Sequence, residues 1–181
     1  MSRRAVVALL LTGVLAGVVG AGCGGSAASS PSTTQPPLPA GPTPSAIAKQ
    51  PCEREARQQI ASALGETATV SDPTWVDHLY ACTYQYPTGS MTLSIKELSD
   101  WGQTLAYFGS FGAQTGKTRS LPGLGQGAYQ TTNGSVVVRK DWKVLLVDPT
   151  RLPAQFGVPP TSSVYVAVTV ADVILGCWEG D

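Results

Sequence analysis

The residues of this 181-residue chain that could do chemistry are few, since it has one histidine and four cysteines. A serine hydrolase would need the histidine between a serine and a carboxylate, but His78 has Asp77 as its sequence neighbour, which is poorly placed to orient the ring. The chain also lacks a G-x-S-x-G elbow, and its cysteines form no C-x-x-C pair of the kind that binds zinc. We therefore expect no catalytic residue, metal or cofactor, and we interpret His78 as an exposed loop residue near Trp75.

Two glycine-rich stretches look like nucleotide-binding loops but have the wrong spacing. "GAQTGKT" (112–118) has three residues between its first glycine and the Gly-Lys pair, where a P-loop has four. "GLGQGA" (123–128) precedes an expected strand, whereas a dinucleotide fingerprint follows one. We expect the first stretch to be the end of a helix followed by a basic loop, and the second to be a flexible turn. Consequently, we predict no hydrolase or nucleotidase activity that depends on His78, Lys117 or Ser135.

Charge gives little indication of a partner. The chain has 12 basic and 12 acidic residues, and the balance becomes about −2 once Arg3 and Arg4 of the leader are removed. A nucleic-acid partner would favour a basic face, so this balance argues against one. The stretch "VVVRKDWK" (136–143) is locally basic around Trp142. It is either a solvated turn or a contact for an anionic lipid, glycan or partner protein.

The cysteine nearest the N-terminus follows an apolar segment. A basic start (1–4) precedes a 15-residue apolar stretch (5–19), small residues and then Cys23. This order is typical of a secretory signal peptide, which we place at residues 1–22. The apolar run up to residue 22 is 18 residues long, somewhat shorter than the ~20 that a membrane-spanning helix needs.

This segment resembles the lipobox of bacterial lipoproteins. Ala21 and Gly22 match the pattern, whereas Gly20 stands where a leucine or similar residue is usual. The resemblance implies cleavage before Cys23 and lipidation of its thiol. Residues 23–50 are rich in Gly, Ser, Thr and Pro and carry no charge until Lys49, so we interpret them as a flexible linker. The expected location is the extracytoplasmic face of the cell membrane, with an ordinary cleaved signal peptide as the alternative.

Export would place the other three cysteines in an oxidising compartment. Three cysteines allow one internal disulfide and one leftover. We favour Cys52–Cys82, with Cys177 as a buried apolar thiol. The alternatives are a Cys52–Cys177 bridge, or an exposed Cys177 that links two copies of the chain.

Residue patterns in 51–181 predict one α+β domain. A helix is expected over 51–65 from the spacing of Cys52, Ala56, Ile60 and Leu64. Two strands flank the turn at 87–89, and a helix over 99–116 follows, with Ser99 as a possible cap. Asn133-Gly134 predicts a hairpin with positive φ at both positions.

The remaining strands are expected at 128–131, 136–140 and 143–147. The tail from Val164 to Trp178 fits either a strand or a helix, and we favour the helix because that pattern covers the longer span. The order α-β-β-α-β-β-β-α predicts an antiparallel sheet of about five strands, with helices packed on one side.

The domain is also similar to a group of actinobacterial lipoproteins that share a domain of unknown function. The similarity lies in segments such as "PCEREARQQIASALG", "LPGLGQGAY" and "VADVILGCW" and in their order. It implies an exported α+β domain and transfers no activity.

These observations favour a non-enzymatic, membrane-anchored lipoprotein that binds a protein, lipid or glycan of the cell envelope or supports an assembly there. An envelope enzyme or enzyme subunit with an unrecognised site is the alternative. A concave site with converging polar groups of perturbed pKa would indicate an enzyme, whereas an apolar groove would indicate a binding module.

Overall fold

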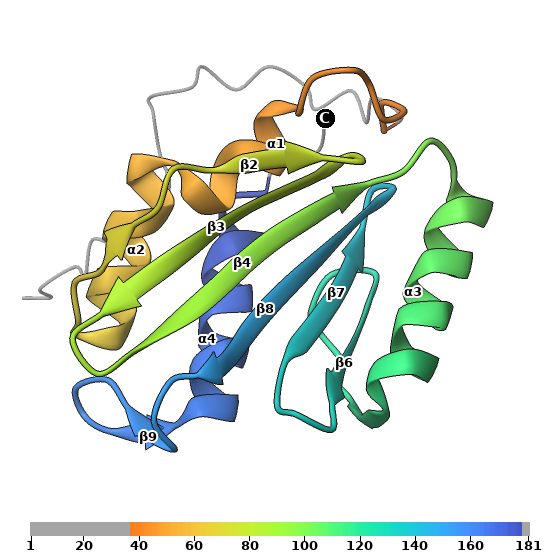
Figure 1. Ribbon diagram of the computed structural model, residues 1–181. Helices are drawn as coiled ribbons and strands as arrows, with labels where there is room; N and C mark the ends of the chain where they lie inside the picture. The colour runs from red at the N-terminus through yellow and green to blue at the C-terminus, as the bar shows by residue number, and fades with distance from the viewer. Residues whose placement is uncertain (1–36, 179–181) are drawn as a thin grey trace, which may run out of the picture.

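The computed structural model describes residues 37–178, which form a mixed α+β structure around a large antiparallel sheet (Figure 1). No helix in this part of the chain is long and apolar enough to cross a membrane. The elements are α1 (Ala46–Lys49), η1 (Gln50–Cys52), α2 (Arg54–Leu64), β1 (Thr69–Val70), β2 (Thr74–Val76), β3 (Leu79–Tyr86), β4 (Gly89–Glu97), α3 (Trp101–Thr115), β5 (Lys117–Ser120), β6 (Gly127–Thr131), β7 (Val136–Lys140), β8 (Lys143–Arg151), β9 (Gln155–Phe156), β10 (Thr161–Ser162) and α4 (Ser163–Gly176).

The main sheet has eight strands rather than the expected five. Its order is β1-β3-β4-β8-β7-β6-β5, with β2 also paired to β3, and β9 and β10 form a separate two-stranded sheet. The five expected strands are all present as β3, β4, β6, β7 and β8. The additional strands β1, β2 and β5 have two to four residues each and lack a run of alternating apolar residues, so the sequence pattern does not reveal them.

The expectation that all helices pack on one side is wrong. Helices α2 and α4 cover the face to which Leu145 and Val147 of β8 point, whereas α3 packs on the opposite face, against Val144 and Leu146. Strands β7 and β8 contain the continuous apolar runs "VVV" and "VLLV". Because successive strand residues point to opposite faces, such runs require both faces to be covered.

The helices form where residue spacing predicts them. Helix α2 buries Ala56, Ile60 and Leu64 and ends at Gly65, which has a left-handed φ of 66°. The ambiguous tail is helical, and the Ser162 side chain caps α4 by accepting a hydrogen bond from the backbone N–H of Tyr165. Helix α3 is capped by Asp100, one residue later than the expected Ser99.

The residues with positive φ in the hairpin turns are not the predicted ones. Positive φ at both central positions occurs at Asp77-His78 and at Asp141-Trp142, which identifies these as the tight turns between β2 and β3 and between β7 and β8. At Asn133-Gly134 only the glycine has a positive φ, so the predicted turn type there is wrong. The Asn133 side chain accepts hydrogen bonds from Thr131 Oγ1 and Ser135 N instead.

The N-terminal part of the described chain packs against the domain, although it falls in the expected linker. The Ala40 N–H donates to the Leu98 carbonyl over 3.1 Å, and Ser45 Oγ donates to the carboxylate of Glu97. Ala48 of α1 is completely buried. The stretch between Cys23 and the first described residue, Pro37, is therefore 13 residues long.

The predicted disulfide between Cys52 and Cys82 is confirmed. It joins the segment before α2 to β3 with a Cα–Cα distance of 6.0 Å. Cys177 is half-buried, and its sulfur lies 3.1 Å from Gln59 Oε1. The expectation that Cys177 is a buried free thiol is wrong, since no described cysteine is free.

Candidate functional site

The residues that could have built a catalytic centre lie on separate elements. His78 is exposed in the β2–β3 turn, where its ring meets Trp75 edge-on at 5.6 Å and its Nδ1 lies 3.0 Å from the Gly41 carbonyl, as expected for a loop histidine. Lys117 is exposed on β5, and Ser135 is buried just before β7. Within residues 37–178, no group of three His, Cys, Asp or Glu residues could hold a metal ion.

The glycine-rich stretches and the basic hairpin also have structural explanations. Gly112 lies inside α3 and Thr118 inside β5, so the chain passes from helix to strand, the reverse of a P-loop. Residues 123–126 form the turn before β6. In the basic hairpin, Lys143 is only 1 % exposed, and the Arg139 guanidinium lies 4.2 Å from the centre of the Trp101 ring. Cys23, the proposed lipid attachment site, lies outside the described residues.

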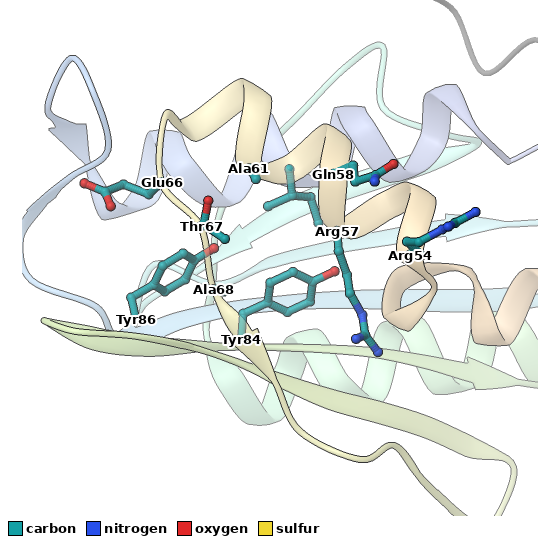
Figure 2. A pocket seen from close by; sticks show the side chains of 10 residues that line it. Arg54, Arg57, Gln58, Ala61, Glu66, Thr67, Ala68, Tyr84 and Tyr86 are labelled. Atoms are coloured by element: carbon teal, nitrogen blue, oxygen red, sulfur yellow. The ribbon is translucent and has the colours of Figure 1, made fainter.

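A cleft of about 290 Å³ lies between α2, the segment that follows it, and β3 (Figure 2). Its lining combines two arginines, one glutamate, one glutamine and two tyrosines with small and apolar side chains. The lining residues are Arg54, Arg57, Gln58, Ile60, Ala61, Glu66, Thr67, Ala68, Tyr84 and Tyr86.

Positive charge is concentrated at the end of the cleft nearest the disulfide. Arg57 Nε donates to the carbonyl of Cys52 over 2.6 Å, which fixes the guanidinium beside Tyr84. Within residues 37–178, neither the terminal nitrogens of Arg57 nor the exposed side chain of Arg54 has a hydrogen-bonding or ion-pair partner. The two arginines therefore offer free N–H donors to a ligand.

Two buried tyrosines separate this end from Glu66 (Figure 2). The Tyr84 hydroxyl donates to the Pro51 carbonyl over 2.5 Å, whereas the buried Tyr86 hydroxyl has no hydrogen-bond partner. Burial raises the pKa of Tyr84, and the neighbouring Tyr86 adds to the shift while Arg57 partly offsets it. Burial, assisted by the nearby Glu66 carboxylate, raises the pKa of Tyr86 to about 12. Both phenols are therefore neutral at physiological pH.

A concave cleft with converging polar groups of raised pKa is the pattern expected of an enzyme, but the direction of these pKa shifts suits ligand binding better than catalysis. A general acid or base works best with a pKa close to the operating pH, but burial moves both tyrosines further from neutrality. The cleft also contains no histidine, cysteine or lysine. Free guanidinium groups beside apolar surface are suited to holding an anionic group with a short apolar chain.

The sequence interpretation missed this cleft, although part of its signal was visible. The alternation of Cys82, Tyr84 and Tyr86 places the two tyrosines on the helix-covered face of the sheet, and the α2 stripe through Ile60 faces them. The arginines looked like ordinary surface residues, because only the fold shows that they flank a concavity.

Comparison with known proteins adds no family assignment, since the chain matches no family model, no curated protein and no solved structure.

Proposed function

We propose that this protein is an exported lipoprotein, anchored to the outer face of the cell membrane through Cys23, whose domain binds a small anionic amphiphile in the cleft between α2 and β3. Support for the anchor comes from the order of basic start, apolar segment, small residues and cysteine. Two or more acyl chains on Cys23 would hold the protein stably, whereas one chain binds only marginally.

The observation that carries the binding role is Arg57, whose terminal N–H groups beside Tyr84 have no partner among the described residues, together with the exposed Arg54 further along the cleft lining (Figure 2). The arginines would bind a phosphate or carboxylate, and the apolar wall at Ile60 and Ala61 would bind a short chain.

Titration with n-octyl phosphate, followed by two-dimensional NMR, tests the binding site. Resonances of residues 54–68 and 84–86 should shift, and n-octanol, which lacks the charge, should bind more weakly. Arg57→Gln should weaken binding about tenfold or more, because a hydrogen bond to a charged group contributes roughly 1.5–3 kcal/mol. Arg54→Gln, which removes an exposed side chain and leaves the core intact, should also weaken it.

Arg119→Gln serves as the matched control, because Arg119 is an exposed arginine on β5 outside the cleft. Equal weakening by Arg119→Gln and Arg57→Gln would show that the attraction is non-specific. Shifts spread over the whole domain, with none centred on the cleft, would contradict the proposed site.

The anchor is tested separately by cell fractionation. Cys23→Ala should move the protein from the membrane fraction to an unprocessed or released form. An unchanged mature mass and an unchanged membrane fraction would contradict lipidation at Cys23.

A further inference from the structure

Exposed apolar side chains gather at one end of the described domain. Of its six exposed large hydrophobic residues, four lie where the N-terminal segment, the β2–β3 turn and the start of α3 meet. These four are Leu38, Val76, Trp101 and Leu105, with exposed fractions of 54, 64, 43 and 44 %. We name them the tether end.

Backbone hydrogen bonds hold these segments together. The carbonyl of His78 accepts from Glu97 N, and the carbonyl of Trp142 accepts from Leu98 N. The Leu98 carbonyl in turn accepts from Ala40 N. Both tight turns, the N-terminal segment and the approach to α3 therefore converge on the end of β4 and on Leu98, which follows it (Figure 1).

The same end carries most of the tryptophans. Trp75 is half-buried in β2 just before the β2–β3 turn, Trp142 is half-buried in the β7–β8 turn, and Trp101 is exposed in the first turn of α3. Tryptophan favours the boundary between lipid headgroups and acyl chains, because its ring is apolar and its N–H can still find a partner. In addition, α3 itself contains no charged residue over its whole length. The nearest charges are Asp100, which caps the helix, and the Arg139 guanidinium, 4.2 Å from the centre of the Trp101 ring, and both would lie at headgroup level when Trp101 reaches the headgroup–acyl boundary.

The linker from Cys23 joins the domain at the tether end, which indicates that the membrane is the surface that this end faces. The described chain begins at Pro37, and Ala40 is fixed to Leu98, so the 13 residues that follow Cys23 reach the domain here. Such a stretch spans at most about 45 Å when extended and roughly 20 Å as a flexible coil. A lipid on Cys23 therefore keeps the tether end, rather than the opposite end, close to the bilayer.

We propose that the tether end docks on the membrane that holds the anchor, with Trp101 and Leu105 inserted at the headgroup–acyl boundary. This inference rests on the proposed anchor at Cys23. Charges of both signs lie at this end: the Lys96 ammonium donates to the Asp77 carbonyl, the Arg139 guanidinium lies over the Trp101 ring, and Asp100 caps α3. Because these charges are mixed, apolar insertion rather than net charge drives the contact. Docking should accordingly require no excess of anionic lipid.

Quenching of tryptophan fluorescence by brominated lipids tests the docking. The full, lipid-bearing protein is reconstituted into zwitterionic phosphatidylcholine vesicles with bromine at a shallow or a deep acyl position. We expect stronger quenching by the shallow bromine, little change when anionic phosphatidylglycerol is added, and loss of most of the quenching in Trp101→Phe. Leu105→Ser, which leaves all tryptophans in place, should reduce the quenching as well.

Tyr165→Ser is the matched control, since Tyr165 is 62 % exposed but lies at the start of α4, away from the tether end. It should leave the quenching unchanged. Flotation with the vesicles, measured first, separates the two proposals. Protein that floats but shows no quenching keeps the anchor and overturns the docking, whereas protein that does not float overturns both.

Discussion

The two faces of the sheet are built differently. On the face covered by α2 and α4, buried residues from both helices and from strands β3, β4, β7 and β8 form one continuous core. On the α3 face, the buried apolar cluster of the described residues contains just Tyr129, Val137 and Val144, and the aromatic side chains of α3 that cover it are themselves half-exposed. The first face supplies most of the apolar burial that stabilises the fold, while the second leaves apolar side chains available to a partner surface.

The helices reflect the same difference. Helix α4 buries five of its side chains, whereas α3 buries only Thr104 and Gly112. The hydroxyl of Tyr129 donates to the Phe108 carbonyl over 3.0 Å, so a polar contact takes part in attaching α3. The two faces should accordingly respond differently to truncation and to backbone substitution.

The largest expected effect comes from truncating the core on the α2/α4 face. Ile174→Ala should lower the free energy of unfolding by about 2 to 5 kcal/mol, because Ile174 is completely buried and its removal leaves a cavity. Phe111→Ala, on the half-exposed α3 face, should cost about half as much despite removing a larger side chain. Urea denaturation of both variants measures the difference. Equal losses would contradict the distinction between the faces.

Loss of the disulfide should come next. The Cys52–Cys82 bridge joins residues separated by 30 positions, so in the chain-entropy model it stabilises the fold by about 3.5 kcal/mol. The double variant Cys52→Ala, Cys82→Ala should therefore unfold at a much lower urea concentration. It should also bind octyl phosphate more weakly, because the Cys52 carbonyl positions Arg57. Unchanged stability in the double variant would contradict this role of the bridge.

Alkaline pH should lower the free energy of unfolding through one buried tyrosine on each face of the sheet. Burial raises the pKa of Tyr86 and Tyr129 to about 12 from an ordinary value of 10, with a smaller contribution from Glu66 for Tyr86 and from Tyr107 for Tyr129. The folded state thus favours the neutral phenol, and this stabilisation is complete below pH 10 and is lost as the pH rises towards 12. Each tyrosine should account for about 2 kcal/mol of the loss.

Urea denaturation between pH 8 and 12 checks this pH dependence. Tyr86→Phe and Tyr129→Phe should each flatten the alkaline decline. Tyr165→Phe, at an exposed position, is the control and should not. A decline that is equally steep in all three variants would contradict the assignment.

The smallest effects should come from two glycines, one beside each face. Gly65 has a φ of 66°, and a Cβ placed there would lie 2.8 Å from the Val158 carbonyl oxygen, so Gly65→Ala should destabilise the fold by about 1 to 2 kcal/mol. Gly109 lies inside α3 with nothing near its missing Cβ, so Gly109→Ala should stabilise the helix by about 1 kcal/mol. Thermal unfolding of the two variants should thus shift in opposite directions.

Much of the fold was predictable from the sequence because it follows residue periodicity. The α2 stripe, the alternation in β3 and β4 and the helical face of the tail each determined their element correctly. The placement of α3 on the opposite face was missed, although the continuous apolar runs in β7 and β8 contained the signal. The edge strands β1, β2 and β5 depend on backbone pairing, which leaves little trace in side-chain type.

The candidate site was much less predictable. The disulfide could be inferred because Cys52 and Cys82 lie on elements that pack together, whereas the cleft depends on tertiary neighbours of Arg57 and Tyr86 that no local pattern shows. The positive φ values at His78 and Trp142 also escaped prediction, since bulky residues rarely adopt them.

The measurement that tests the account most directly is the mass of the N-terminal peptide of the mature protein, extracted from membranes. Lipid anchoring predicts a peptide that begins at Cys23 and carries a diacylglyceryl group on its sulfur. A mature protein that begins at another residue, or a Cys23 without lipid, would contradict the proposed anchor and remove the basis for membrane docking of the tether end.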